Sequence, residues 1–260
     1  MSSTNLMRTA VAALLLSPLM ALAAVGKVTK VEGEAHRVAT SRQTRQPVEG
    51  AIPTRLAIGD GIELNDRITV AEKANLKVTL NDGSVVIVGP ESTLYIDEAS
   101  FEGQERKGFG TYLEVGRIWA KVKKAVAGSN AKFEVTTERA VAGVRGTIFR
   151  VDALKATLMA NSQPSKRRVA TVVQVKEGKV AVADPRKYAQ MLAQGQTVPA
   201  KGPRKQVAGP QEIDAEEWER RFVLLKAGRK VTVGPDLWEV GRTGKADNDA
   251  FDAWIRENGD

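Results

Sequence analysis

Apolar and polar residues alternate with a period of two over most of the chain between Val25 and Val182. In the segment 76–80, Leu, Val and Leu alternate with Lys and Thr, and the segment 169–175 repeats the pattern. Successive side chains of a β-strand point to opposite faces of a sheet, so this period indicates half-buried strands. Helical spacing is nearly absent here. We therefore predict an all-β domain of many short strands.

Glycines mark where these strands turn. The run Asn81-Asp82-Gly83-Ser84 separates two β-rich segments and predicts a hairpin, because a tight turn needs the positive φ that glycine adopts freely. Gly33, Gly116 and Gly178 each lie between two aliphatic runs, where we expect a strand to bend at a corner. The unequal spacing of these three glycines excludes a fixed-period solenoid. The predicted fold is a mainly β roll or irregular sandwich, with a small C-terminal helical extension.

The helical extension begins after residue 210. Asp214 and Glu217 form a capping box, and Trp218, Phe222 and Leu225 follow at i, i+4 and i+7. This spacing predicts a helix over 214–227 that ends at Gly228.

Beyond that helix, residues 241–249 read as a second flexible link. Phe251, Trp254 and Ile255 then make a short amphipathic turn. We expect the 214–227 helix to dock on the β-domain and residues 241–260 to be mobile. The alternative is that the apolar residues of the tail bind a partner; these are Trp218, Phe222, Leu225, Phe251 and Trp254.

The first 23 residues predict export. Arg8 precedes an apolar stretch, and Ala21-Leu22-Ala23 has the small-x-small pattern that a signal peptidase accepts. The stretch is short for a membrane span and contains Pro18, which favours cleavage after Ala23 over retention as an anchor. We expect a periplasmic or secreted protein with no stable membrane span after cleavage.

Composition narrows the chemistry. The 260 residues include no Cys and a single His, so disulfides, thiolate metal sites, Cys nucleophiles and mechanisms that need two histidines are excluded. No phosphate-binding, dinucleotide, metal or nucleophile motif occurs. We therefore expect a protein that is not an enzyme and that needs no cofactor or metal.

Charge is distributed unevenly along the chain. The net charge is +8, residues 159–210 alone carry a net +8, and residues 211–260 carry −4. In an exported protein, we expect anionic glycans or lipid headgroups rather than nucleic acid to face a basic segment. Lys166, Arg167 and Arg168 are the candidate polyanion contacts, and the alternative is a solvated loop.

Residues 142–151 contain the candidate ligand site or structural corner, made of Gly143, Arg145, Gly146 and Thr147. Flanking glycines allow a ligand to approach closely, and a guanidinium can bind a carboxylate with two hydrogen bonds. One interpretation is a site for an anion or a peptide terminus. The other is that Arg145 pairs with an internal acid, Asp82 or Asp60, while Thr147 bonds a backbone group of the same corner.

Several segments together resemble the FecR domain over residues 25–183. The resemblance rests on IGDGI at 58–62, LNDGSV at 80–85, LEVGRI at 113–118, FEVTT at 133–137, AGVRGTIFRV at 142–151 and VKEGKV at 175–180. The most specific of these is AGVRGT-x-F. The resemblance implies an all-β periplasmic module known from the outer part of iron-uptake anti-sigma regulators. Those regulators carry a cytoplasmic helical segment and a membrane span ahead of the domain, whereas here we expect only a signal peptide, so anti-sigma activity is not carried over.

The expected organisation is a signal peptide at 1–23, a FecR-like β-domain at 24–200, a basic linker at 201–210 and a helical tail at 211–260. The expected function is that of a non-catalytic exported binding module, used in protein–protein interaction in envelope signalling or assembly. The alternative is a binder of anionic envelope glycan or lipopolysaccharide that uses the basic segment 159–210.

Overall fold

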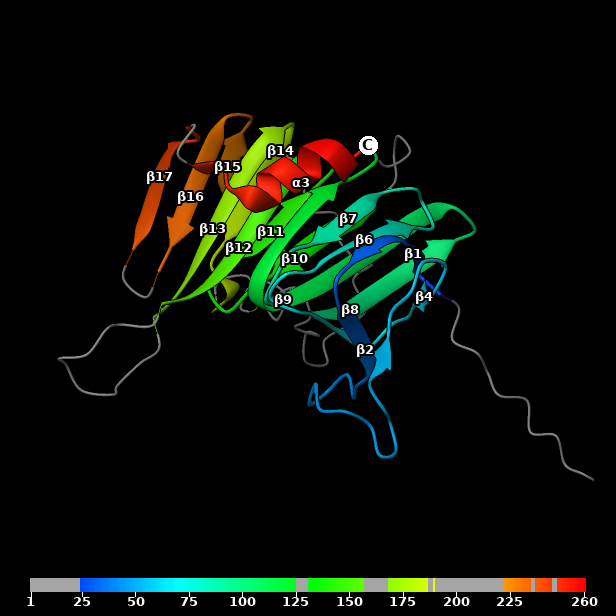
Figure 1. Cartoon of the computed structure of the whole chain (residues 1–260). Coiled ribbons are helices and arrows are strands. Elements are labelled where there is room, and N and C mark those ends of the chain that lie inside the picture. Colours follow the sequence, from blue (N-terminus) through cyan, green and yellow to red (C-terminus); the bar gives the residue numbers. More distant parts are fainter. Residues whose placement is uncertain are drawn as a thin grey trace, which may run out of the picture.

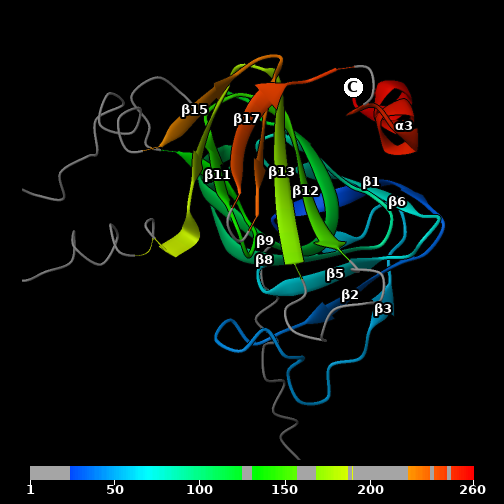
Figure 2. The same cartoon turned by 90° about the vertical axis from the view of Figure 1, so that its left-hand side faces the viewer.

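In a computed structural model, the described part of the chain comprises residues 24–124, 131–156, 168–186, 189, 222–234, 237–244 and 247–260. The strands form two facing layers, sheets A and B, joined by the long strand β9 (Figures 1 and 2). The described pairings are antiparallel, with the exception of the parallel pair β9–β10. This architecture confirms the predicted mainly β sandwich.

Each sheet has its own strand order. Sheet A runs β4 (Gly61–Ile62), β1 (Gly26–Glu32), β6 (Asn75–Leu80), β7 (Val85–Val88), the second half of β9 (Glu105–Lys121), β12 (Ile148–Ala156), β13 (Arg168–Glu177), β16 (Arg229–Val233) and β17 (Trp238–Arg242). Sheet B runs β3 (Thr54–Arg55), β2 (Ala35–Ala39), β5 (Asp66–Val70), β8 (Ser92–Glu102), the first half of β9, β10 (Lys132–Thr136), β11 (Val141–Val144), β14 (Lys179–Ala183) and β15 (Val223–Lys226).

Glycines at positive φ lie where the chain passes from one sheet to the other. Gly33 links β1 to β2, Gly178 links β13 to β14, and Gly116 bends β9 between the sheets, with φ values of 75°, 79° and 98°. At Gly116 a β-carbon would collide with Ser92, so both the backbone conformation and the packing require glycine. The predicted corners at these three positions are confirmed, and the hairpin at Asp82-Gly83 joins β6 to β7.

The core lies between the two sheets and is filled by alternate residues of the strands. Phe133 is at its centre, with ring centroids 5.0 Å from Phe109 and 6.1 Å from Phe149. The three rings come from β9, β10 and β12, so they tie both layers together where the strands cross. Burial of such side chains is worth about 1.5–3 kcal/mol each.

The predicted helix over 214–227 is wrong for residues 223–226, which form strand β15. Leu225 is buried and pairs with Val180 of β14, and Gly228 turns the chain back into β16 with φ 76°. The spacing of Phe222 and Leu225 fits one face of a helix but not one face of a strand, so the local pattern favoured the wrong element. A glycine at positive φ serves a helix C-cap and a hairpin turn equally, so the signal at Gly228 does not separate the two.

The C-terminal helix α3 (Ala250–Asn258) packs on the outer face of sheet A. Phe251 and Ile255 are 3% and 8% exposed and lie against Val85 and Ile87 of β7 and Trp119 of β9. The predicted mobility of 241–260 is therefore wrong for this helix, and the predicted flexible link begins inside β17. Figure 1 shows α3 lying across sheet A near β12 and β7. In the described residues, no helix has the length and apolarity to cross a membrane.

Candidate functional site

A row of small residues hollows the outer face of sheet B. Strand register places Glu134 of β10 beside Gly143 of β11, Gly143 beside Ala181 of β14, and Ala181 beside Leu224 of β15. The neighbouring residues Phe133, Val144, Val180 and Leu225 belong to the core, so this row points away from it. A pocket of about 370 Å³ opens at this row, and we call it the corner pocket. Its lining residues are Lys124, Lys132, Phe133, Glu134, Gly143, Val144, Arg145, Gly146, Gly178, Lys179, Ala181 and Leu224.

The rim of the corner pocket is basic. Lys132 of β10 and Lys179 of β14 are exposed, as is Arg145 directly after β11, and Lys124 adds a fourth cation beside the Gly146 corner. Lys132 contacts Glu98 at 2.7 Å. Partial burial opposes the charge of Lys132, but the hydrogen bond to Glu98 and the nearby Glu134 outweigh this, so the pKa of Lys132 is raised. Lys132 therefore stays protonated at neutral pH.

Backbone geometry at the corner holds Arg145 at the rim. Gly146 has φ 72°, and a β-carbon there would lie 2.9 Å from the Cα of Lys124, which leaves no room for a side chain. The buried hydroxyl of Thr147 donates to the carbonyl of Lys179 at 2.9 Å and joins this corner to the next one at Gly178. We expected Thr147 to bond a backbone group of its own corner, whereas its hydroxyl reaches the neighbouring corner instead.

Arg145 does not pair with the internal acids that the sequence suggested. Asp82 is bound by the buried Arg106, and the carboxylate of Asp60 accepts a hydrogen bond from the Ala57 backbone N–H at 2.8 Å. Within the described residues, Arg145 forms no ion pair. Its guanidinium is exposed next to a pocket, which favours the ligand interpretation of this motif over the structural one.

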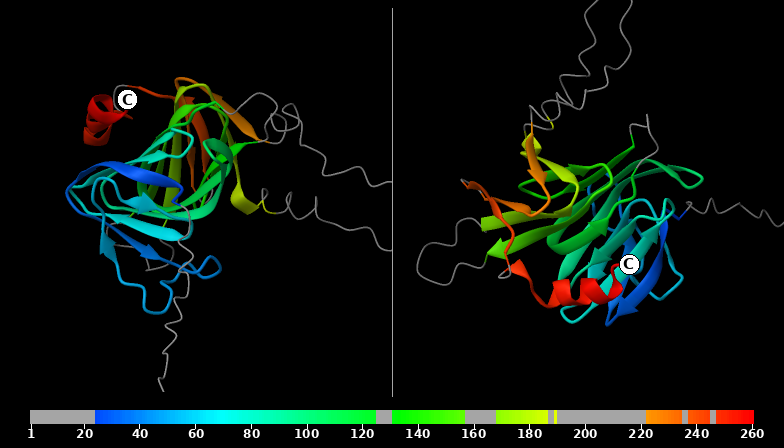
Figure 3. Two further views of the ribbon diagram at one scale, coloured as in Figure 1. Left: turned by 90° about the vertical axis from the view of Figure 1, so that its right-hand side faces the viewer. Right: turned by 90° about the horizontal axis from the view of Figure 1, so that it is seen from above.

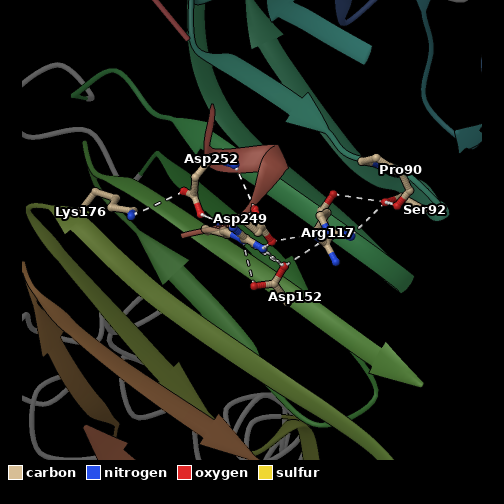
Figure 4. A network of polar contacts seen from close by, with 8 residues as sticks. Pro90, Ser92, Arg117, Asp152, Lys176, Asp249 and Asp252 are labelled. Atoms are coloured by element: carbon tan, nitrogen blue, oxygen red, sulfur yellow. Dashed lines mark hydrogen bonds and ion pairs between the residues drawn. The ribbon is translucent and has the colours of Figure 1, made fainter. Parts of the chain in front are cut away.

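A second polar cluster lies on the opposite outer face, under the start of α3 (Figure 4). Arg150 of β12 is 4% exposed and contacts Asp152 at 2.9 Å, Asp249 at 2.7 Å and Asp252 at 2.5 Å. Burial opposes the charge of Arg150, but its hydrogen bonds and ion pairs with these acids hold its pKa above the ordinary value. We call these four residues the Arg150 cluster.

The Arg150 cluster also fixes α3. Asp249 is the N-cap of the helix and forms a capping box with Asp252, and Arg117 of β9 contacts Asp249 at 2.7 Å. Partial burial opposes the ionised form of Asp249, but hydrogen bonds from Arg150 and the Asp252 backbone lower its pKa to about 2. Sequence reasoning missed this cluster because two of its three acids, Asp249 and Asp252, lie about 100 residues after Arg150 in the chain, and no local pattern connects them to it.

The remaining predicted site residues are not gathered in one place. Lys166, Arg167 and Trp218 lie outside the described residues, and Arg168 begins β13 opposite Ala156. Phe222 directly precedes β15, in which Leu225 faces the core. Phe251 packs under α3, and the Trp254 indole N–H donates to Glu32 at 2.6 Å. In the described part of the chain, Leu225, Phe251 and Trp254 thus serve internal packing.

No metal-binding group is assembled within the described residues: no three His, Cys, Asp or Glu side chains are placed to hold an ion. The acids under α3 are occupied by Arg150 and Arg117. The exposed cations of the corner pocket, by contrast, can donate charge-assisted hydrogen bonds to an anion.

Comparison with known proteins gives one family. Residues 66–181 match the model of the family described as FecR protein. Two solved structures, at 1.65 and 2.50 Å resolution, are similar, and both are of "a putative anti-sigma factor" from Parabacteroides distasonis ATCC 8503. For each of them the identity is 18% and the TM-score 0.42, and the match covers 73% of this chain and 64% or 63% of the other. The chain thus spans less than two thirds of those proteins. No curated protein matches the chain at a significant level.

Proposed function

Residues 66–181 match the FecR family model, and from this premise we propose that the chain is a non-catalytic, exported binding module of the cell envelope. Its ligand is an acidic segment of a partner protein, which it binds in the corner pocket. The module takes part in envelope signalling or assembly through this contact.

The observation that carries the proposal is the exposed guanidinium of Arg145 beside a pocket of about 370 Å³ with a basic rim. A carboxylate on an extended segment can accept two hydrogen bonds from this guanidinium. The small residues Gly143 and Ala181 leave room for the segment over the sheet, and Leu224 offers an apolar contact at the end of the row. The pocket therefore offers Arg145 to a charged group of a peptide and Leu224 to an apolar group.

Export supports an envelope partner. The segment 1–23 has the features of a signal peptide, and it directly precedes β1, the first described strand. A FecR domain in the periplasm or outside the cell meets envelope proteins, so a protein ligand is available there.

The alternative function is recognition of an anionic glycan or lipopolysaccharide through the basic segment 159–210. Lys179 belongs to that segment and lies on the rim of the corner pocket, so the two functions share a surface. Contacts to a polyanion release counterions and weaken steeply with salt, whereas a peptide with an apolar contact keeps part of its affinity.

A defined probe tests the proposal. Fluorescein-labelled oligo-glutamate is titrated with residues 24–260, and anisotropy reports binding. Arg145→Glu should weaken binding about tenfold or more, because charge-assisted hydrogen bonds contribute about 1.5–3 kcal/mol. Arg42→Glu makes the same charge change at an exposed position on the β2–β3 connection and should leave the affinity unchanged.

Lipopolysaccharide micelles form the second arm of the same titration. Binding to micelles that disappears in moderate salt, with no binding of the peptide, would establish the glycan alternative instead. Equal losses in Arg145→Glu and Arg42→Glu would show that net charge, and not the corner pocket, governs binding.

A further inference from the structure

Strand β17 forms an outer edge of sheet A and exposes two apolar side chains, Trp238 and Val240, beside the charged Glu239 and Arg242. Within the described residues it pairs with β16 alone. Leu237, Trp238 and Val240 are 46%, 39% and 39% exposed. Edge strands commonly carry charges, prolines or bulges that prevent pairing with another chain, and an exposed apolar edge invites such pairing. Figures 2 and 3 show this edge at the side of the sandwich opposite the N-terminal strands.

Two backbone hydrogen bonds show which groups of β17 face outward. The Gly234 N–H donates to the Leu237 carbonyl at 2.8 Å, and the Thr243 N–H donates to the Gly228 carbonyl at 2.9 Å. Hydrogen-bonded and non-hydrogen-bonded pairs alternate along an antiparallel ladder. Glu239 and Gly241 therefore direct their backbone groups to β16, and Trp238, Val240 and Arg242 direct theirs away from it.

We propose that a second copy of this chain pairs antiparallel with the outer edge of β17, with Val240 opposite Val240 of the copy. This register pairs every residue of β17, because Trp238 then lies opposite Arg242 of the copy and Glu239 opposite Gly241. A shift that centres the pair on Glu239 places two carboxylates opposite each other, which is unfavourable. A shift that centres it on Gly241 moves Trp238 beyond the end of the partner strand.

Charge and shape favour a second copy over an unrelated peptide. In the β16–β17 hairpin, Arg229 lies opposite Arg242, a repulsive pair, and neither forms an ion pair with a described residue. Pairing with a copy brings the Trp238 ring beside Arg242, where a cation–π contact forms. The contact occurs twice in the two-fold dimer, so the same five residues supply both halves of the interface.

This interface is independent of the corner pocket, because β17 ends sheet A whereas the pocket lies on sheet B. Loss of the dimer would leave the proposed ligand site in place. Loss of ligand binding would likewise leave the dimer in place, so the two proposals fail separately.

A cysteine scan tests the register directly, because the chain has no cysteine of its own. Hydrogen-bonded antiparallel pairs have Cα atoms about 5.5 Å apart, within the reach of a disulfide. Val240→Cys should therefore form a disulfide-linked dimer rapidly on mild oxidation. Glu239→Cys and the exposed turn variant Lys73→Cys should form dimers only at the slow rate of random collision.

The unmodified protein gives the second readout. Residues 24–260 should be dimeric in light scattering coupled to size exclusion. Val240→Lys, which places two ammonium groups opposite each other, should be monomeric and keep the far-ultraviolet circular dichroism spectrum of the parent, which shows that it still folds. A monomeric parent protein together with equal oxidation rates at positions 240 and 73 would overturn the proposal. The same conclusion would follow if the parent were monomeric and Val240→Lys removed binding to another protein, since β17 would then receive a partner strand.

Discussion

The two outer faces of the sandwich differ in what covers them. The face of sheet A is covered by α3, which buries Phe251 and Ile255 on an apolar cluster and closes the Arg150 cluster above it. The face of sheet B carries the corner pocket, whose basic rim faces outward. Arg145 and Arg150 lie five positions apart on either side of the Gly146 corner, and one is exposed while the other is 4% exposed. The chain around Gly146 therefore places one arginine on each outer face. Arg145 is exposed beside the corner pocket, whereas Arg150 is buried in ion pairs with acidic side chains.

The largest expected effect is loss of Arg150. Arg150→Ala removes the nearest cation of the buried Asp152 and Asp252 and leaves only Arg117 and Lys176 at 3.9 and 3.6 Å, which should lower the free energy of unfolding by about 3 kcal/mol. Arg145→Ala, on the open face, should change it by no more than about 0.5 kcal/mol. Urea unfolding of the two variants measures both values. Similar losses of unfolding free energy in the two variants would show that Arg150 is no more important to the fold than the exposed Arg145.

Gly146→Val should destabilise the corner between the faces by about 3 kcal/mol. A valine at φ 72° is strained, and its β-carbon would press on the Lys124 backbone. Gly50 has φ 76° and open space around it, so Gly50→Val carries the strain without the collision and should cost about half as much. Melting curves of the two variants separate the backbone strain from the steric collision. Equal shifts in melting temperature would show that packing against Lys124 does not require glycine at position 146.

Phe251→Ala should cost about 2 kcal/mol, less than a phenylalanine deep in the core, because it loosens α3 and leaves the sandwich intact. Trp119 lies beneath α3, so its fluorescence should shift to the red in this variant. Leu224→Ala at the corner pocket should change stability little. A larger loss for Leu224→Ala than for Phe251→Ala would reverse the assignment of a closed and an open face.

The smallest expected effect is a dependence on acid pH. Asp249 has a pKa of about 2 in place of 3.8, so its ionised form stabilises the folded state. This contribution is complete above about pH 4 and is lost as the pH falls towards 2. Because the side chain is 37% exposed, solvent screening reduces it to about 1 kcal/mol. Asp249→Asn should be less stable than the parent at pH 7 and should lose less stability between pH 4 and 2. Chemical unfolding at each pH measures both differences. Parallel curves of unfolding free energy against pH for the variant and the parent would contradict the pairing of Asp249 with Arg150.

Local signals in the sequence predicted much of the fold. The period of two identified the strands, and Gly33, Gly116 and Gly178 lie at corners because a positive φ at a sheet crossing is a property of one residue and its neighbours. The sequence did not predict β15, because Phe222 and Leu225 have helical spacing, whereas the strand is set by pairing with β14. Tertiary pairing outweighs local spacing in such short segments.

The candidate site was predicted in part. The AGVRGT motif drew attention to Arg145 and Gly146, whose place at the rim follows from local corner geometry, and to Thr147, which is buried behind them. The corner pocket itself depends on the register of four strands, and the Arg150 cluster depends on α3 docking from about 100 residues away. Neither long-range arrangement leaves a pattern in a single stretch of sequence.

The most direct test of the account is a nuclear magnetic resonance titration of residues 24–260 with the oligo-glutamate peptide. The account predicts that the backbone amide signals of Gly143, Arg145 and Ala181 shift as the peptide is added, while those of Val85, Ile87 and Trp119 under α3 do not. Shifts confined to the residues under α3, or no shifts at saturating peptide, would contradict the assignment of the sheet B face as the binding face.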